Sequence, residues 1–157
     1  MERVNKVLRH PMYIKTLDKI ASIEANRIFC KHDFEHFLAV ARIAYALCLE
    51  ENYYLDAEIL YTAAVLHDIG RGKQYEDGTP HEEESARIAE NILPECGFDQ
   101  SEIEMISYAI LMHRTQTGEK PGFAGYLYRA DKLSRMCFNC PAEEQCDWKV
   151  KNTQLKY

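Results

Sequence analysis

The sequence predicts an all-α domain, and three observations support this fold class. Apolar residues recur at helical spacing along most of the 157-residue chain, as Val40, Ala44 and Leu47 illustrate. The alternating pattern of a half-buried strand is weak throughout. No internal repeat, low-complexity segment or Ser/Gly-rich linker interrupts the chain, whose length suits one ordinary domain. We therefore expect one helical bundle around a single core.

The helical pattern falls into six segments. They cover approximately residues 12–27, 34–48, 55–68, 80–93, 101–113 and 123–135. Asp33 directly precedes the second segment and has the short carboxylate side chain typical of an N-cap. The third segment runs into Gly70 and Gly72, which are expected to end it. The following stretch RGKQYEDGTP, residues 71–80, is therefore predicted to be a loop.

The fourth segment opens with the phrase Thr79-Pro80-His81-Glu82. Thr79 and Glu82 have the spacing of a capping box, in which each side chain bonds the backbone N–H of the other residue. Pro80 then occupies the first helical position, where a missing N–H costs nothing. The phrase predicts a helix that continues to Leu93.

Composition and charge exclude several classes of function. The net charge of −6 argues against broad nucleic-acid binding, which depends on Lys and Arg at the phosphates, but it leaves room for a local basic site. The N-terminal stretch MERVNKVLRHPMY lacks the apolar run of a signal peptide, and no segment approaches the ~20 apolar residues of a membrane span. We expect a cytoplasmic protein without membrane or nucleic-acid partners. Its six cysteines are then expected to be thiols or metal ligands.

Polar residues interrupt the predicted apolar stripes at a few places. Four histidines lie where predicted helices begin or end, one aspartate follows a histidine, and another lies within the stretch YLYRADKLS. They are His36, His67, His81, His113, Asp68 and Asp131. A single histidine at a helix end is typically a cap or a satisfied core residue. Together these side chains supply nitrogen and carboxylate ligands for a divalent transition metal, which would offset the cost of burying the two aspartates.

Three phrases of the sequence resemble the signatures of HD-domain metal-dependent phosphohydrolases. They are HFLAVARIA from His36, AAVLHDIGRG around His67 and Asp68, and YRADKLS around Asp131. The resemblance covers about residues 30–135. It implies a helical bundle in which His36, His67, Asp68 and Asp131 hold a metal. It divides the chain into an HD phosphohydrolase domain at 1–136 and a cysteine-containing tail at 137–157 that belongs to the same compact unit. His32 matches no ligand position and is expected to serve local structure.

Two further histidines bear on the number of metal ions. The phrases PHEEESARIAENIL and ILMHRTQTG place His81 and His113 where two-metal members of the superfamily have additional ligands. The second phrase is similar to that of members that split symmetrical dinucleoside polyphosphates. Related single-metal enzymes can carry a histidine near position 81 as well. The resemblance therefore implies one or two divalent ions, with iron, manganese, zinc and magnesium as the candidates.

The chemistry implied by this resemblance is hydrolysis of a phosphoester or phosphoanhydride bond of a nucleotide-type substrate. A metal would lower the pKa of water and neutralise phosphate charge, with Asp68 as the catalytic residue that bridges the ions or orients the nucleophile. Arg71 and Lys73 follow the HD pair and are expected to contact substrate phosphates, although a solvated loop face explains them equally well. The alternatives are a non-catalytic HD module that binds a nucleotide or a partner, and a di-iron oxygenase of HD type.

The tail contains a C-x2-C-x5-C pattern formed by Cys137, Cys140 and Cys146. Thiolates at this spacing are typical of a structural zinc site or an iron–sulfur cluster. A fourth ligand would come from Cys30, Cys96 or a non-cysteine group. Free thiols or a disulfide are the alternative.

Overall fold

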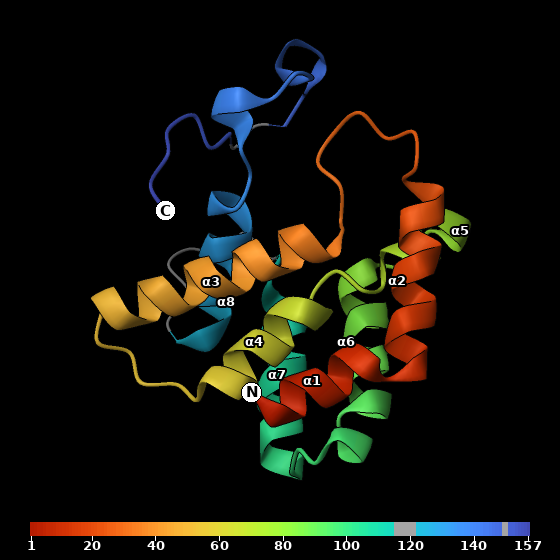
Figure 1. Cartoon of the computed structure of the whole chain (residues 1–157), viewed down its shortest axis with the longest axis vertical. Helices are drawn as coiled ribbons and strands as arrows, with labels where there is room; N and C mark the ends of the chain where they lie inside the picture. Colours follow the sequence, from red (N-terminus) through yellow and green to blue (C-terminus); the bar gives the residue numbers. More distant parts are fainter. Residues whose placement is uncertain (115–121, 149–150) are drawn as a thin grey trace.

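The computed structural model describes residues 1–114, 122–148 and 151–157, and its regular structure is helical. No strand occurs in these residues, which confirms the expected all-α fold (Figure 1). The α-helices are α1 (Glu2–Arg9), α2 (Pro11–Ile23), α3 (Phe34–Glu50), α4 (Ala57–Leu66), α5 (Arg71–Asp77), α6 (His81–Ile92), α7 (Gln100–Met112) and α8 (Phe123–Leu133). The 3-10 turns are η1 (Pro94–Cys96), η2 (Cys137–Asn139) and η3 (Glu143–Gln145).

The core lies where α3, α4, α7 and α8 meet. Helix α3 packs against α4 and α8, α4 packs against α7, and α6 lies along α7. The largest fully buried apolar side chains of these helices are Phe37, Leu47, Leu60, Leu66, Ile92, Ile106, Ile110 and Leu127. Each contributes roughly 1.5–3 kcal/mol by leaving water. This packing brings the start of α3 and the ends of α4 and α7 to one place.

Helix α3 begins as the sequence predicts. Asp33 is its N-cap, and its Oδ1 atom accepts a hydrogen bond of 2.9 Å from the backbone N–H of His36. This bond satisfies one of the free amides of the first turn. It also fixes the backbone of the first expected metal ligand.

The N-terminal part of the chain differs from the prediction. Residues Glu2–Arg9 form α1, which was not expected, and α2 ends at Ile23 rather than near residue 27. The break between the two helices is at His10, whose backbone is extended with ψ of 131°. The residue before a proline is driven out of the helical region by the proline ring, and Pro11 follows.

The predicted loop at 71–80 is wrong, because Arg71–Asp77 form α5. The third predicted helix does end before Gly70, because α4 ends at Leu66, but Gly70, with φ of −78°, is also the N-cap of α5. Gly78 ends α5 with φ of 82°, a left-handed conformation that favours glycine.

The capping box predicted at Thr79–Glu82 is also wrong. The N-cap of α6 is Pro80, without a side-chain cap, and the Thr79 hydroxyl donates to Asp77 Oδ1 at 2.7 Å instead. A reciprocal capping box does occur at the start of α7, between Asp99 and Glu102. Among the described residues, no helix has the length and apolar character needed to cross a bilayer.

Candidate metal centre

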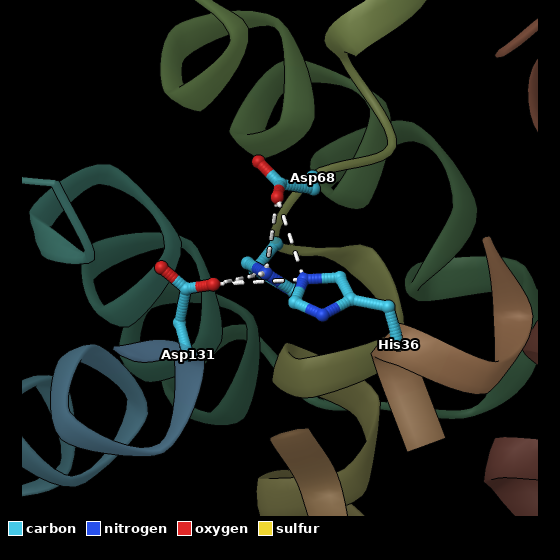
Figure 2. Close-up of side chains that lie close together, drawn as sticks. His36, Asp68 and Asp131 are labelled. Atoms are coloured by element: carbon cyan, nitrogen blue, oxygen red, sulfur yellow. Dashed lines mark ion pairs between the residues drawn. The ribbon is translucent and has the colours of Figure 1, made fainter. Parts of the chain in front are cut away.

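Four of the expected metal ligands converge from three parts of the chain. They are His36 in the first turn of α3, His67 and Asp68 after α4, and Asp131 in α8. Each offers one ligand atom, and these atoms all lie within 4.8 Å of one another. Figure 2 shows His36, Asp68 and Asp131 pointing toward one another.

The distances within this group are those of side chains facing a common point. Nε2 of His36 lies 3.5 Å from Asp131 Oδ1 and 3.8 Å from Asp68 Oδ2. Nε2 of His67 lies 3.3 Å from Asp68 Oδ2 and 3.9 Å from Asp131 Oδ1. We call His36, His67, Asp68 and Asp131 the HD group.

The four ligand atoms of the HD group are buried and make no hydrogen bond. They are Nε2 of His36, Nε2 of His67, Oδ2 of Asp68 and Oδ1 of Asp131. A buried polar atom without a partner costs about 1–3 kcal/mol, and more when it is charged. Neutral imidazole nitrogens and carboxylate oxygens are the ligand types of divalent transition metals, so these residues fit such an ion.

Local backbone geometry orients two of the histidines. His67 and His113 follow the last turns of α4 and α7, where the final carbonyls have no helical partner. Nδ1–H of His67 donates to the Ala64 carbonyl at 2.7 Å, and Nδ1–H of His113 donates to the Ile110 carbonyl at 2.6 Å. Because Nδ1 carries the proton, the lone pair of each Nε2 faces inward as a metal ligand requires.

A second ligand group shares Asp68 and contains His81 and His113. Oδ1 of Asp68 lies 2.8 Å from Nε2 of His81 and 3.6 Å from Nε2 of His113, and the two nitrogens are 3.2 Å apart. All three residues are buried, and their ligand atoms lie within 4.8 Å of one another. The structure thus brings together all six expected metal ligands, with one carboxylate oxygen of Asp68 in each group.

The proton positions in this second group also favour a cation. Nδ1–H of His81 donates to Oε1 of Gln74 at 2.9 Å, and Arg71 donates to the same oxygen, which fixes the orientation of the amide. Nδ1 of His113 is already committed to a carbonyl. Lone pairs on two nitrogens and on one Asp68 oxygen therefore face one another, an arrangement that a divalent cation would stabilise.

Electrostatics hold the carboxylates ionised and the imidazole of His81 neutral. Burial by itself would raise the pKa of Asp68, but the Arg71 guanidinium and the neighbouring imidazoles lower it well below its usual range. Burial lowers the pKa of His81 to about 4, although Asp68 opposes this shift. These are the protonation states in which both side chains bind metals.

Two cationic residues act on Asp131 from α8 and the segment after it. Burial would raise the pKa of Asp131, but Lys132 and Arg135, together with His67, lower it. Nζ of Lys132 lies 2.5 Å from Oδ2 of Asp131, and the Arg135 guanidinium lies 3.6 Å from the same oxygen. Oδ1 of Asp131 makes no such contact and is the ligand atom that this residue offers to the HD group.

Side chains that the sequence did not mark as functional also reach the centre. His32 is buried, its Nε2 atom lies 3.8 Å from Asp68 Oδ2, and its Nδ1–H donates to Glu24. Tyr75 donates its hydroxyl to the same carboxylate of Glu24. The spacing HDFEH was the only signal for His32, while Glu24 at the end of α2 and Tyr75 in the predicted loop carried none.

The two expected substrate contacts lie in different surroundings. Arg71 lies beside the centre, where its Nε donates to Asp68 Oδ1 at 2.9 Å. Lys73 is not brought to the ligand groups, because its ammonium lies 2.5 Å from Asp77 and lines a separate cleft of about 380 Å³. Substrate binding by either residue stays a prediction.

A cleft of about 350 Å³ leads to the HD group from the surface. His36 lines it, together with residues of the segment between α2 and α3 on one side and residues 134–141 on the other. Among the described residues, the close ligand groups include no cysteine. Cys137 and Cys140 instead line this cleft and, with Cys146, a smaller cavity behind it.

A family model for the HD domain matches residues 33–136, which include the whole HD group. The chain belongs to the HD-domain family. A protein from Clostridium beijerinckii, described as uncharacterised, is 45% identical to this chain over the full length of both. The matched region is helical in the residues that the structure describes, and it contains both His/Asp groups.

Two other similarities cover part of the HD protein. The crystal structure of a predicted HD superfamily hydrolase from an uncultured Thermotogales bacterium superposes with a TM-score of 0.62 at 29% identity, covering 80% of this chain and 67% of the other. A bifunctional uridylyltransferase/uridylyl-removing enzyme from Gluconobacter oxydans is 41% identical over 54 residues, which are 34% of this chain and 5% of that enzyme.

Proposed function

We propose that this HD protein is a metal-dependent phosphohydrolase that cleaves a phosphoester or phosphoanhydride bond of a nucleotide-type substrate. The observation that carries the proposal is the set of four buried ligand atoms of the HD group that make no hydrogen bond. A divalent cation held by His36, His67, Asp68 and Asp131 supplies a Lewis acid that lowers the pKa of water and neutralises charge on a phosphoryl group.

Asp68 organises the centre in this proposal. Its carboxylate is buried and ionised, and its two oxygens face the two ligand groups. Arg71 donates from Nε to Oδ1 of Asp68 at 2.9 Å and from Nη1 to Gln74 at 3.1 Å, so its guanidinium is held near the centre. A guanidinium in this position suits a phosphate oxygen, because it offers several N–H donors in one plane.

The cleft beside His36 suits a small-molecule substrate. Its volume of about 350 Å³ lies at the lower end of the range for ligand sites, roughly 300–1,000 Å³. Its lining contains the cationic side chains of Lys31 and Arg135, together with the carboxylates of Asp33 and Glu35. The uridylyl-removing relative is named for removing a nucleotide group, which supports a nucleotide-type substrate for the matching segment of this chain.

We further propose that the active form holds two metal ions, as in the members that split dinucleoside polyphosphates. The support is the second group of Asp68, His81 and His113, in which three lone pairs face one another. A pair of ions would share the carboxylate of Asp68.

The test is a substrate screen on protein reconstituted with iron, manganese, zinc or magnesium, read by phosphate and nucleotide release. The panel contains nucleoside mono-, di- and triphosphates and dinucleoside polyphosphates. We expect turnover of at least one compound and none by Asp68→Ala, while Asp18→Ala, which removes an exposed carboxylate of α2, retains it. A metal-loaded parent that turns over no compound supports the binding module. Dioxygen uptake by the reduced iron-loaded protein supports the oxygenase.

A further inference from the structure

Four of the six cysteines surround one small cavity. The cavity measures about 20 Å³ and is lined by Phe29, Cys30, Cys137, Cys140, Glu143, Cys146 and Lys151. All four cysteines are free thiols. Cys30 thus joins the three tail cysteines, although the sequence alone offered Cys96 as an equal candidate. Cys96 is buried at η1 and does not line the cavity.

Tertiary structure brings these residues together from opposite ends of the chain. Cys30 lies in the segment between α2 and α3, and in Figure 1 this segment and the C-terminal tail occupy the same end of the molecule. The Asn152 side chain anchors the tail by donating to the carbonyls of Leu133 and Arg135 at 2.8 and 2.9 Å. The tail is therefore held against the end of α8, with its thiols toward Cys30.

Tight turns present two of the thiols. Turn η2 ends at Cys140 and turn η3 ends at Cys146, and each cysteine has the extended backbone of the C-cap position.

We propose that Cys30, Cys137, Cys140 and Cys146 bind one zinc ion. Four cysteine thiolates in tetrahedral geometry form a common structural zinc site. The small volume of the cavity, about 20 Å³ against the ~10–15 Å³ that one water molecule needs, favours a single ion over an iron–sulfur cluster. A cluster of several iron and sulfur atoms requires more room.

We expect the four thiols to move closer to one another when zinc binds. Among the described residues, no three cysteine sulfurs come within 4.8 Å of one another, unlike the ligand atoms of the His/Asp groups. Zinc–sulfur bonds of about 2.3 Å bring tetrahedral ligands to roughly 3.8 Å apart. The turns at η2 and η3 lie in the tail rather than in the core, so this adjustment leaves the helical packing unchanged.

The zinc ion would join two segments of the chain that line the same cleft as His36. Cys30, from the segment between α2 and α3, and Cys137 and Cys140, from the tail, all line this cleft. Crosslinking them through one ion fixes the width of the cleft and holds the segment that carries His32 and Glu24. This site does not depend on the proposed hydrolysis.

The experiment counts zinc in full-length protein whose two His/Asp groups have lost their shared ligand, Asp68. Asp68→Ala removes a ligand from both His/Asp groups, and after dialysis we expect it to retain about one equivalent of zinc. Adding Cys30→Ala should reduce zinc to near zero, whereas adding Cys96→Ala should leave it unchanged. Cys30 is exposed, so its replacement is expected to preserve the fold, which circular dichroism checks.

A second measurement uses the parent protein without substitutions. Maleimide labelling followed by peptide mass mapping should find Cys30, Cys140 and Cys146 protected together, and a chelator should expose them together. Cobalt in place of zinc should give thiolate-to-metal charge-transfer absorption. Zinc retained by the variant with Cys30→Ala, labelling that ignores the chelator, iron with acid-labile sulfide, or a disulfide found by mass would each overturn the proposal.

Discussion

Oδ1 of Asp68 lies 2.8 Å from Nε2 of His81, whereas Oδ2 of the same carboxylate faces His36 and His67 and makes no hydrogen bond. One buried side chain therefore joins two ligand groups that come from different helices. Replacing His81 removes a ligand from only one of them, so the contributions of the two groups can be separated.

His81→Ala should lower the metal content of the reconstituted protein from two equivalents to one. The second group retains only Asp68 and His113 in this variant, while the HD group keeps all four ligands. Elemental analysis after reconstitution with excess iron or manganese measures the change. His10→Ala, at the junction of α1 and α2, is the matched control and should keep two equivalents. One equivalent in the parent would contradict the two-metal form.

Arg71→Ala should weaken substrate capture by about 1.5–3 kcal/mol, the range for one lost charge-assisted hydrogen bond. The loss should appear in kcat/KM for whichever nucleotide the parent cleaves. Lys73→Ala should cost less, because the ammonium of Lys73 pairs with Asp77 away from the ligand groups. Equal losses of kcat/KM in the two variants would show that the position of Arg71 beside Asp68 does not contribute to substrate capture.

Gly70→Ala should destabilise the protein, whereas Gly72→Ala should not. A Cβ at position 70 would lie 2.4 Å from the His81 carbonyl oxygen and 2.7 Å from the Ser85 nitrogen, and backbone atoms cannot move aside. Overpacking of this kind typically costs about 1–3 kcal/mol. A Cβ at position 72 would lie 3.3 Å from the flexible side chain of Lys19, and alanine in a helix is favoured by about 1 kcal/mol over glycine.

Urea denaturation of the two glycine variants measures this difference. The prediction has a functional corollary, because position 70 adjoins both Asp68 and the first turn of α6. A displaced α6 should carry His81 away from Asp68 and lower metal content. Equal stability of Gly70→Ala and the parent would show that α6 is not held by this close approach.

Glu24→Gln should reduce the loss of stability in acid. Burial by itself would raise the pKa of Glu24, but the hydrogen bond and charge of His32 and the hydroxyl of Tyr75 lower it from 4.5 to about 2. Between these pH values the unfolded state binds more protons than the folded state. The free energy of unfolding of the parent therefore falls as the pH drops from about 4.5 toward 2, by at most ~1.4 kcal/mol per pH unit for this group.

Chemical denaturation of metal-free protein at several pH values tests this dependence. The variant cannot titrate at position 24 and should show a shallower decline across this window, with Asp68 and the other carboxylates present in both proteins. Identical slopes for parent and variant would mean that the pKa of Glu24 is not depressed in the folded state.

Local signals in the sequence were sufficient for most of the fold. Asp33 caps α3, as a short carboxylate before an apolar stripe predicts, and the periodic segments at 101–113 and 123–135 are helices within a few residues of their predicted bounds. The errors arose where two local signals competed. At 70–78 several turn-forming residues occur together, yet Gly70 is the N-cap of α5 and Gly78, with φ of 82°, directly follows its last residue.

The sequence by itself determined the helical class and marked the six candidate ligands that the structure brings together, because both depend on residue type and spacing along the chain. Only the tertiary structure decided that Asp68 shares its two oxygens between two groups, that Lys73 points away, and that Cys30 joins the tail. The tertiary structure alone also decided the hydrogen bonds of His32 with Glu24 and of His81 with Gln74. The physical reason is that these contacts join side chains from different helices, and their distances depend on how the core packs rather than on any local pattern.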